Sequence, residues 1–240
     1  MSNVVIKDLN VKYDDKVIFD SFNIEFEEGK VNVILGSSGV GKTTILNCIA
    51  GILPYSGDIK GHEAGVSYIF QKDRLIPSIT IYKNLDLVLK AIIKDKKERK
   101  EKIQKMLQVL EIEDCAKKYT TEMSGGQIQR AAIARAFLYP SNVLLLDEPF
   151  KALDTSLKSK LIKVLLELHR AERKTVIFVT HAIDECLLSA DNIFVFANNP
   201  VEVIYNTKIE KDAMSRTLLD PELDGVRKEL LSLISKEPEF

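Results

Sequence analysis

Apolar residues near the start of the chain alternate with polar ones in short runs. Over residues 4–26 this pattern favours antiparallel strands with one face in water, because successive side chains of a strand point to opposite faces. After a short turn, the unbroken apolar run of residues 31–35 predicts a more buried strand. A further strand is predicted over residues 66–70.

From about residue 78 to residue 139, apolar residues recur at the three- and four-residue spacing that is typical of helices. One predicted helix face is formed by Ile103, Met106, Leu107 and Leu110. Residues 94–102 mix six basic side chains with three acidic ones. We interpret this charged run as the solvated face or loop of a helical insertion rather than as a binding tail.

Strand-like runs return at residues 143–146, 175–179 and 193–196. An amphipathic pattern between the first two predicts a helix, and a strand-helix-strand crossover implies parallel strands. Residues 201–205 are expected to pair back as an edge hairpin. The charged tail from residue 211 carries one more helical pattern.

These elements predict an α/β fold with a parallel central sheet, an N-terminal antiparallel β-subdomain and an inserted helical subdomain. We expect a single domain over residues 1–240, with a core at 1–77 and 140–210, helices at about 78–139 and a helical tail at 211–240.

The composition is that of a globular protein, with 45% hydrophobic and 29% charged residues. A net charge of −1 gives no electrostatic footprint for nucleic acid, so no nucleic-acid partner is expected. No run approaches the roughly 18 apolar residues of a membrane span, and the N-terminus lacks the layout of a signal peptide. We therefore expect a cytoplasmic chain whose three separated cysteines are packed, reduced thiols.

A phosphate-binding P-loop pattern lies between the strand at 31–35 and the following helix. Its residues are Gly36, Ser37, Ser38, Gly39, Val40, Gly41, Lys42, Thr43 and Thr44. Glycines let the backbone curl closely around a phosphate, so that N–H groups point at the anion. Lys42 is expected to meet the outer phosphates, while Thr43 offers a hydroxyl to Mg²⁺. The positive end of the following helix faces the same anions.

Two carboxylates, Asp147 and Glu148, end the apolar strand at 143–146. P-loop ATPases bind Mg²⁺ through the first such acid, so Asp147 is a candidate metal ligand beside Thr43. Glu148 is the candidate for polarising the attacking water. An acidic pair after a strand is often only a helix N-cap, but the upstream P-loop favours the metal site.

A second anion-binding surface is predicted at the start of a later helix, where Ser124, Gly125, Gly126 and Gln127 follow the helical insertion. Two such surfaces for one triphosphate suggest that the second serves a nucleotide held by another copy. The alternative is a flexible turn that merely precedes a helix.

The P-loop, residues 124–127 and Asp147-Glu148-Pro149, in this order, resemble the ATP-binding subunit of ABC transporters. The resemblance implies a P-loop ATPase core with ATP and Mg²⁺ as cofactors. It also gives roles to further residues. Gln71 is similar to the glutamine that coordinates Mg²⁺ or water, His181 to the histidine that meets the γ-phosphate, and Ala152-Leu153-Asp154 to the D-loop.

The resemblance places Tyr13 where an aromatic side chain stacks on adenine, although an ordinary strand tyrosine is the alternative. His181 likewise has an alternative as a hydrogen-bonded bystander, which is how we interpret His62 and His169.

Residues 70–77 and 147–154 are similar to ATPase subunits of importers for nitrate, sulfonates, taurine and thiamine precursors. Lys151 stands where that group usually has glycine, and Gln127 stands where it commonly has methionine. An exporter ATPase remains an alternative. A soluble ABC ATPase predicts two ATPase halves or a long coiled coil, neither of which the chain contains.

The resemblance implies a head-to-tail dimer with a second copy or a homologous subunit, and two ATP molecules between them. It also implies transmembrane permease subunits, an indirect solute-binding protein and a location at the cytoplasmic face of the cell membrane. We expect residues 72–85 to contact the permease through an apolar surface. That surface consists of Leu75, Ile76, Pro77, Ile79 and Ile81.

Overall fold

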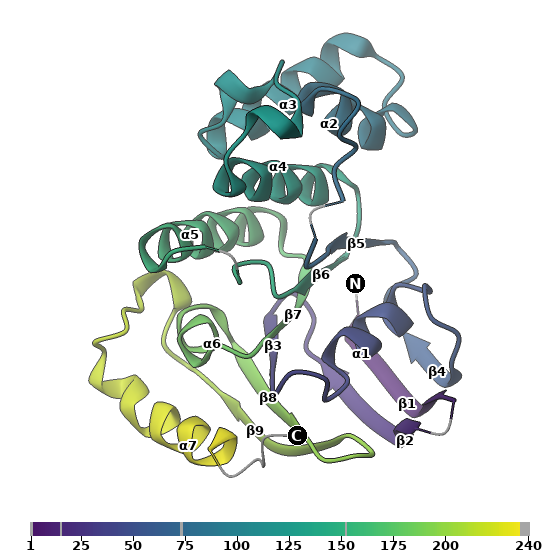
Figure 1. The fold of residues 1–240 in the computed structure, drawn as a ribbon, viewed down its shortest axis with the longest axis vertical. Coiled ribbons are helices and arrows are strands. Elements are labelled where there is room, and N and C mark those ends of the chain that lie inside the picture. The colour runs from purple at the N-terminus through teal and green to yellow at the C-terminus, as the bar shows by residue number, and fades with distance from the viewer. Residues whose placement is uncertain (1, 15, 73, 152, 236–240) are drawn as a thin grey trace.

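The computed structural model describes residues 2–14, 16–72, 74–151 and 153–235 (Figure 1). These residues form an antiparallel sheet with the strand order β2-β1-β4 and a larger sheet with the order β5-β6-β7-β3-β8-β9. Helices cover the larger sheet, so the predicted α/β class is confirmed.

The N-terminal sheet consists of β1 (Val4–Tyr13), β2 (Lys16–Phe26) and β4 (Ser56–Lys60). All of its pairings are antiparallel, as the alternating pattern of residues 4–26 predicts. The apolar pattern does not predict β4, because four of its five residues are exposed. Gly57 in β4 has a φ of +107°, and an added Cβ would lie 2.3 Å from the backbone oxygen of Asp8.

The central sheet is parallel except at one edge. Its strands are β3 (Val31–Leu35), β5 (Val66–Ile69), β6 (Val143–Asp147), β7 (Thr175–Thr180), β8 (Asn192–Ala197) and β9 (Glu202–Lys208). Only β9 runs antiparallel, pairing with β8 as the predicted edge hairpin. The register pairs Leu35 with Thr180 and Asp147 with Val179, so the carboxyl ends of these strands lie side by side.

The inner strands β3, β6, β7 and β8 are buried on both faces, which explains their nearly continuous apolar runs. Val143 and Leu145 pack toward α1 (Lys42–Ile49) and the N-terminal sheet. Leu144 and Leu146 pack into a second core with most of the remaining helices. These include α5 (Thr155–Glu172), α6 (Ile183–Ser189) and α7 (Asp224–Ile234). The buried thiols of Cys48, Cys115 and Cys186 are free, as expected.

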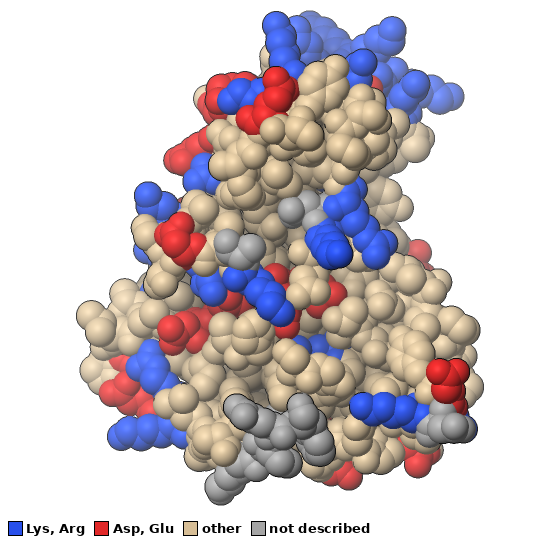
Figure 2. Space-filling view, viewed as in Figure 1, with Lys and Arg blue, Asp and Glu red and all other residues tan. Residues whose placement is uncertain are grey.

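The helical insertion comprises α2 (Ile81–Lys90), α3 (Lys96–Val109) and α4 (Gly125–Leu138), which lie together at the top of Figure 1. The predicted apolar face is buried at Ile103, Leu107 and Leu110. Figure 2 shows basic side chains gathered over this end of the molecule. Arg99 is an exception, because it is buried and its Nε lies 2.6 Å from Asp86 Oδ1.

Short 3₁₀ helices complete the described chain: η1 (Glu113–Cys115), η2 (Thr120–Glu122), η3 (Ala213–Ser215) and η4 (Pro221–Leu223). Within the described residues, no helix combines the length and apolar character that crossing a membrane requires.

The expectation that the apolar residues of 72–85 form a permease-facing surface is partly wrong. Leu75 and Ile81 belong to the core, with 9% and 0% of their surface exposed. Buried Asn84 also ties this loop to α2, because its side chain bonds to the backbone N–H and C=O of Ile76. Ile76 itself is 44% exposed, so only part of the predicted surface faces solvent.

The C-terminal tail is attached to the core by Arg216, a residue that the sequence pattern does not single out. Its buried guanidinium donates hydrogen bonds to the backbone carbonyls of Leu187, Ala190, Ile209 and Lys211. In α7, Leu230 is buried, whereas Leu231 is 52% exposed. The predicted apolar face of the tail is therefore narrower than the sequence suggests.

Replacing Arg216 with Met should lower the free energy of unfolding by about 3 kcal/mol, because several buried carbonyls lose a charged donor. Chemical denaturation measures this loss. The matched control is Arg170→Met, which removes a paired but exposed arginine and should cost less than about 1 kcal/mol. Equal losses for the two variants would contradict the anchoring role of Arg216.

Candidate functional site

The phosphate loop, which we define as residues 36–44, connects β3 to α1 at the carboxyl edge of the central sheet. Gly41 is the N-cap of α1 with a φ of +113°, and an added Cβ would lie 2.9 Å from Val201 Cγ2. Gly39 has a φ of +83° but open space around it. The loop therefore needs glycine at position 41 for conformation and space, and at position 39 for conformation alone.

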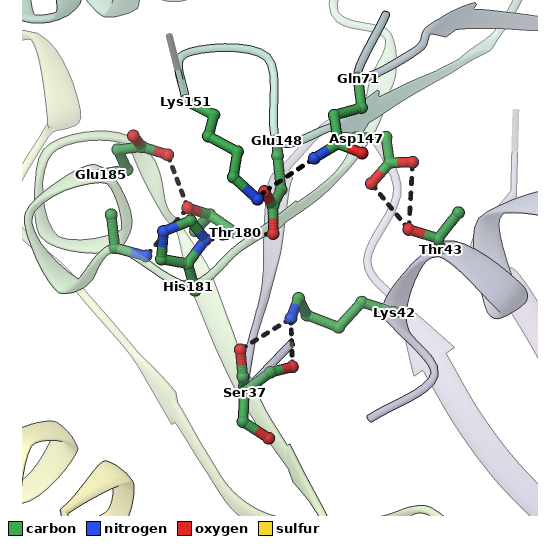
Figure 3. A network of polar contacts seen from close by, with 12 residues as sticks. Ser37, Lys42, Thr43, Gln71, Asp147, Glu148, Lys151, Thr180, His181 and Glu185 are labelled. Atoms are coloured by element: carbon green, nitrogen blue, oxygen red, sulfur yellow. Dashed lines mark hydrogen bonds and ion pairs between the residues drawn. The ribbon is translucent and has the colours of Figure 1, made fainter. Parts of the chain in front are cut away.

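Lys42 points back along the phosphate loop toward Ser37 (Figure 3) and lines a cavity that we call the nucleotide cavity. Its buried Nζ donates to the carbonyl oxygens of Gly36 and Ser37 at 2.7 and 2.6 Å. The nucleotide cavity, of about 250 Å³, is lined by Ser38, Gly39, Gly41, Lys42, Thr43, Thr44, Gln71, Glu148 and Lys151. An ammonium held at a glycine-rich cavity of this kind fits the recognition of phosphate oxygens.

Thr43 and Asp147 face each other across the start of α1 (Figure 3). Thr43 Oγ1 lies 3.0 and 3.1 Å from the two carboxylate oxygens of Asp147. Burial raises the pKa of Asp147 and the charge of Glu148 adds to this rise, while the Thr43 hydrogen bond opposes it. A hydroxyl and a carboxylate are the oxygen donors that Mg²⁺ prefers, so the pair fits the predicted metal site.

Glu148 lies at the centre of the site, with only 9% of its surface exposed. Its Oε2 is 2.7 Å from Lys151 Nζ and 3.3 Å from Gln71 Nε2, and its Oε1 is 3.1 Å from His181 Nδ1. Burial by itself raises the pKa of Glu148, but the hydrogen bonds from Lys151 and His181 outweigh it and lower the pKa. The carboxylate is therefore ionised at neutral pH.

The site residues converge because each follows a different strand. Gln71 comes after β5, Glu148 after β6, His181 after β7 and the phosphate loop after β3. These four strands are consecutive in the parallel part of the sheet. Residues far apart in the sequence are thus placed side by side at the edge where ligands of parallel sheets bind.

The loop that carries His181 is fixed by side chains that sequence reasoning missed. Thr180 Oγ1 donates to Glu185 Oε2 at 2.6 Å and accepts from the backbone N–H of Ala182 at 3.0 Å. Lys158 Nζ, on α5, lies 2.7 Å from Glu185 Oε1. The only sequence signal was a threonine directly before His181.

Residues 124–127, which we call the signature loop, begin α4 with a reciprocal cap. Ser124 Oγ accepts from the backbone N–H of Gln127, and Gln127 Oε1 accepts from that of Ser124. At Gly126 an added Cβ would lie 2.6 Å from Leu157 Cδ2 on α5, so this glycine permits close helix packing. The loop begins a helix as predicted, with Ser124 and Gly125 exposed and Gln127 half-buried.

The signature loop does not line the nucleotide cavity of its own chain. Instead, Ser124, Gly125 and Gly126 line a second space of about 600 Å³, the outer cavity. This cavity is also lined by Gln71, Lys72, Gln129, Glu148, Pro149, Lys151, Leu153, Asp154 and Leu157. The two cavities share three residues, Gln71, Glu148 and Lys151.

The remaining predicted residues lie near these cavities or outside the described chain. Tyr13 ends β1, is 45% exposed and is not among the residues that line the nucleotide cavity, so its stacking on adenine stays a prediction. Val40 is buried in the core. Asp154 caps α5 through the backbone N–H of Leu157. Ala152 lies outside the described residues.

The fold and this geometry together define a P-loop nucleotide-binding protein. Comparisons with known proteins narrow the class. A family model described as ABC transporter matches residues 19–151. The taurine import ATP-binding protein TauB of Escherichia coli O157:H7 is 33% identical to the chain, and the match covers 98% of both proteins. The chain therefore belongs to the ABC transporter family, as an ATP-binding and ATP-hydrolysing subunit.

Other relatives agree with this assignment. The aliphatic sulfonates import ATP-binding protein SsuB of Bacillus cereus is 36% identical over 78% of this chain and 76% of that protein. The structure of cbiO1 from Clostridium perfringens, which is part of the ABC transporter complex cbiONQ, superposes on this chain with a TM-score of 0.78 at 26% identity. The match covers 95% of this chain and 92% of the other. A dimeric bacterial ABC transporter cassette gives a TM-score of 0.75 at 26% identity, covering 87% of this chain and 100% of the other.

Lys42→Ala should weaken ATP binding by about tenfold or more, because the cavity loses a charged hydrogen-bond donor. Isothermal titration with ATP measures the change. Lys60→Ala, which removes an exposed lysine paired with Asp58 on the N-terminal sheet, is the matched control and should bind normally. An unchanged affinity in the Lys42 variant would exclude this cavity as the phosphate site.

Proposed function

We propose that this chain is the ATPase subunit of an importer for a small organosulfonate or related anion, acting at the cytoplasmic face of the cell membrane. The observation that carries the proposal is the placement of Glu148. This ionised carboxylate borders the same cavity as Lys42 and Thr43 of the phosphate loop. A base beside a phosphate-binding loop is the arrangement that nucleotide hydrolysis requires.

Each residue has a role in this chemistry. Backbone N–H groups of the phosphate loop and Lys42 would bind the β- and γ-phosphates, while Thr43 and Asp147 would hold Mg²⁺. When bound, Mg²⁺ neutralises phosphate charge and ATP supplies the phosphoryl group. Glu148 would accept the proton of the attacking water, and Gln71 and His181 would orient its carboxylate.

The proposed active unit is a head-to-tail dimer with a second copy or a homologous subunit. The position of the signature loop supports it, because Ser124, Gly125 and Gly126 border the outer cavity rather than their own nucleotide cavity. A nucleotide on one copy would meet these residues only on the other. The solved bacterial ABC transporter cassette with a similar fold is dimeric, which supports a dimer here.

The transported solute is inferred from the relatives. Those named for taurine and aliphatic sulfonates match this chain at 33% and 36% identity. Both solutes are small organic molecules that carry an anionic sulfonate group, and taurine carries an ammonium as well. We infer that a separate solute-binding protein selects such a sulfonate and that a permease passes it across the membrane.

A surface groove, which shares only Arg74 with residues 72–85, fits the expected contact with the permease better than that segment as a whole. The docking groove, of about 330 Å³, is lined by Val66, Ser67, Tyr68, Phe70, Arg74, Val88, Arg135, Ala136 and Tyr139. Phe70 stacks on Tyr68 with centroids 3.9 Å apart, and Arg74 lies 4.0 Å above the Phe70 ring. Aromatic walls with basic residues suit a short amphipathic helix that carries an acid.

Glu148→Gln should keep ATP binding while lowering turnover by about 10² to 10⁴, the usual effect of losing a general base. Steady-state hydrolysis and light scattering with Mg-ATP measure the two effects. Because ATP stays bound, the variant should accumulate as a dimer. A variant that hydrolyses ATP normally would exclude Glu148 as the base, and one that stays monomeric with bound ATP would argue against the dimer.

Tyr139→Asp should abolish taurine uptake by the assembled transporter while sparing ATP hydrolysis by the free subunit. The substitution places a charge in the docking groove, where Tyr139 is 39% exposed. Uptake of labelled taurine and co-purification with the permease measure coupling. Tyr119→Asp, at an exposed tyrosine on the same insertion but outside the groove lining, is the control. Normal uptake with both variants would exclude the docking groove as the permease contact.

A further inference from the structure

Lys151 is a site residue that the proposed chemistry does not use. Its Nζ lies 2.7 Å from Glu148 Oε2, across the tight turn in which the backbone N–H of Lys151 bonds to the carbonyl oxygen of Glu148. The two partners differ in exposure, since 9% of the Glu148 side chain and 47% of the Lys151 side chain are exposed. A half-exposed ammonium thus reaches inward to a buried carboxylate (Figure 3).

Both carboxylate oxygens of Glu148 are occupied in this arrangement. Oε2 faces Lys151 and Gln71, and Oε1 faces His181. A general base needs a carboxylate oxygen within hydrogen-bond reach of its water, about 2.6–3.2 Å. Lys151 holds the shortest of the three contacts, so its departure would open Oε2 more than the loss of Gln71 would.

Lys151 also has access to other partners. It lines both the nucleotide cavity and the outer cavity, and it shares the latter with the signature loop. The ammonium of lysine is a mobile point charge on a flexible stem, so it changes partners without a change in the backbone. Phosphate oxygens in the nucleotide cavity, or a partner copy at the outer cavity, would compete with Glu148 for it.

We propose that Lys151 is a positioning residue that restrains Glu148 in the free subunit, and that closure around ATP draws its ammonium away. Hydrolysis is then slow until the second copy is in place. The proposal rests on the proposed role of Glu148 as the base.

Removal of Lys151 tests this restraint. Lys151→Ala and Lys151→Met, in the full chain without permease, should raise kcat for ATP by about two- to fivefold, the effect of losing a contact worth at most about 1 kcal/mol to a half-exposed lysine. KM for ATP should stay within about twofold, because the restraint acts on the base rather than on nucleotide binding. Lys151→Arg preserves the cation and should keep the slow rate. Thermal melting verifies that each variant is folded.

Two controls make each outcome decisive. Lys208→Ala removes a lysine from an equally short ion pair, 2.7 Å from Glu27, on the edge strand β9, and it should leave kcat unchanged. A lower kcat, a higher KM or no change in the Lys151 variants would overturn the proposal, since the lysine would then serve the phosphates or have no role. Turnover that persists in Glu148→Gln would instead overturn the proposed role of Glu148 as the base.

Discussion

The parallel pairing of β5, β6, β7 and β3 is the constraint on which the site depends. Because these strands are neighbours with their carboxyl ends at one edge, the four segments that follow them meet there. Glu148 receives donors from Gln71 and His181, which follow strands on either side of its own. A slip of register in this sheet would separate all three side chains at once.

The charges at this edge are balanced locally. Adjacent Asp147 and Glu148 repel each other, and burial disfavours ionisation of both. Lys151 and His181 nonetheless hold the pKa of Glu148 below its usual value, whereas that of Asp147 stays raised. An incoming nucleotide adds several negative charges beside these acids. In the proposed site, Mg²⁺ and Lys42 would offset the charge of its phosphates, which would also compete with Glu148 for the ammonium of Lys151.

Much of this arrangement follows from the sequence, because strand periodicity and glycine spacing are local signals. The sequence predicts the positions of the phosphate loop, of the carboxylates at the end of β6 and of the helical insertion. Contacts between side chains that are distant in the sequence are not predicted by such local signals. The exposed strand β4, the Thr180–Glu185 bond, buried Arg216 and the pairing of Lys151 leave no periodic trace. The sequence does not place Leu75 and Ile81 correctly, because apolar residues in a loop or at a helix start give the same pattern whether they face a partner or the core.

The central claim is that one nucleotide is shared between the phosphate loop of one copy and the signature loop of another. Mixing a Lys42→Ala chain with a Ser124→Arg chain tests it most directly, since neither alone has a complete site. Head-to-tail pairing leaves one of the two shared sites intact, so we predict that the mixture regains ATP hydrolysis that each variant lacks. A mixture as inactive as its components would contradict the shared site.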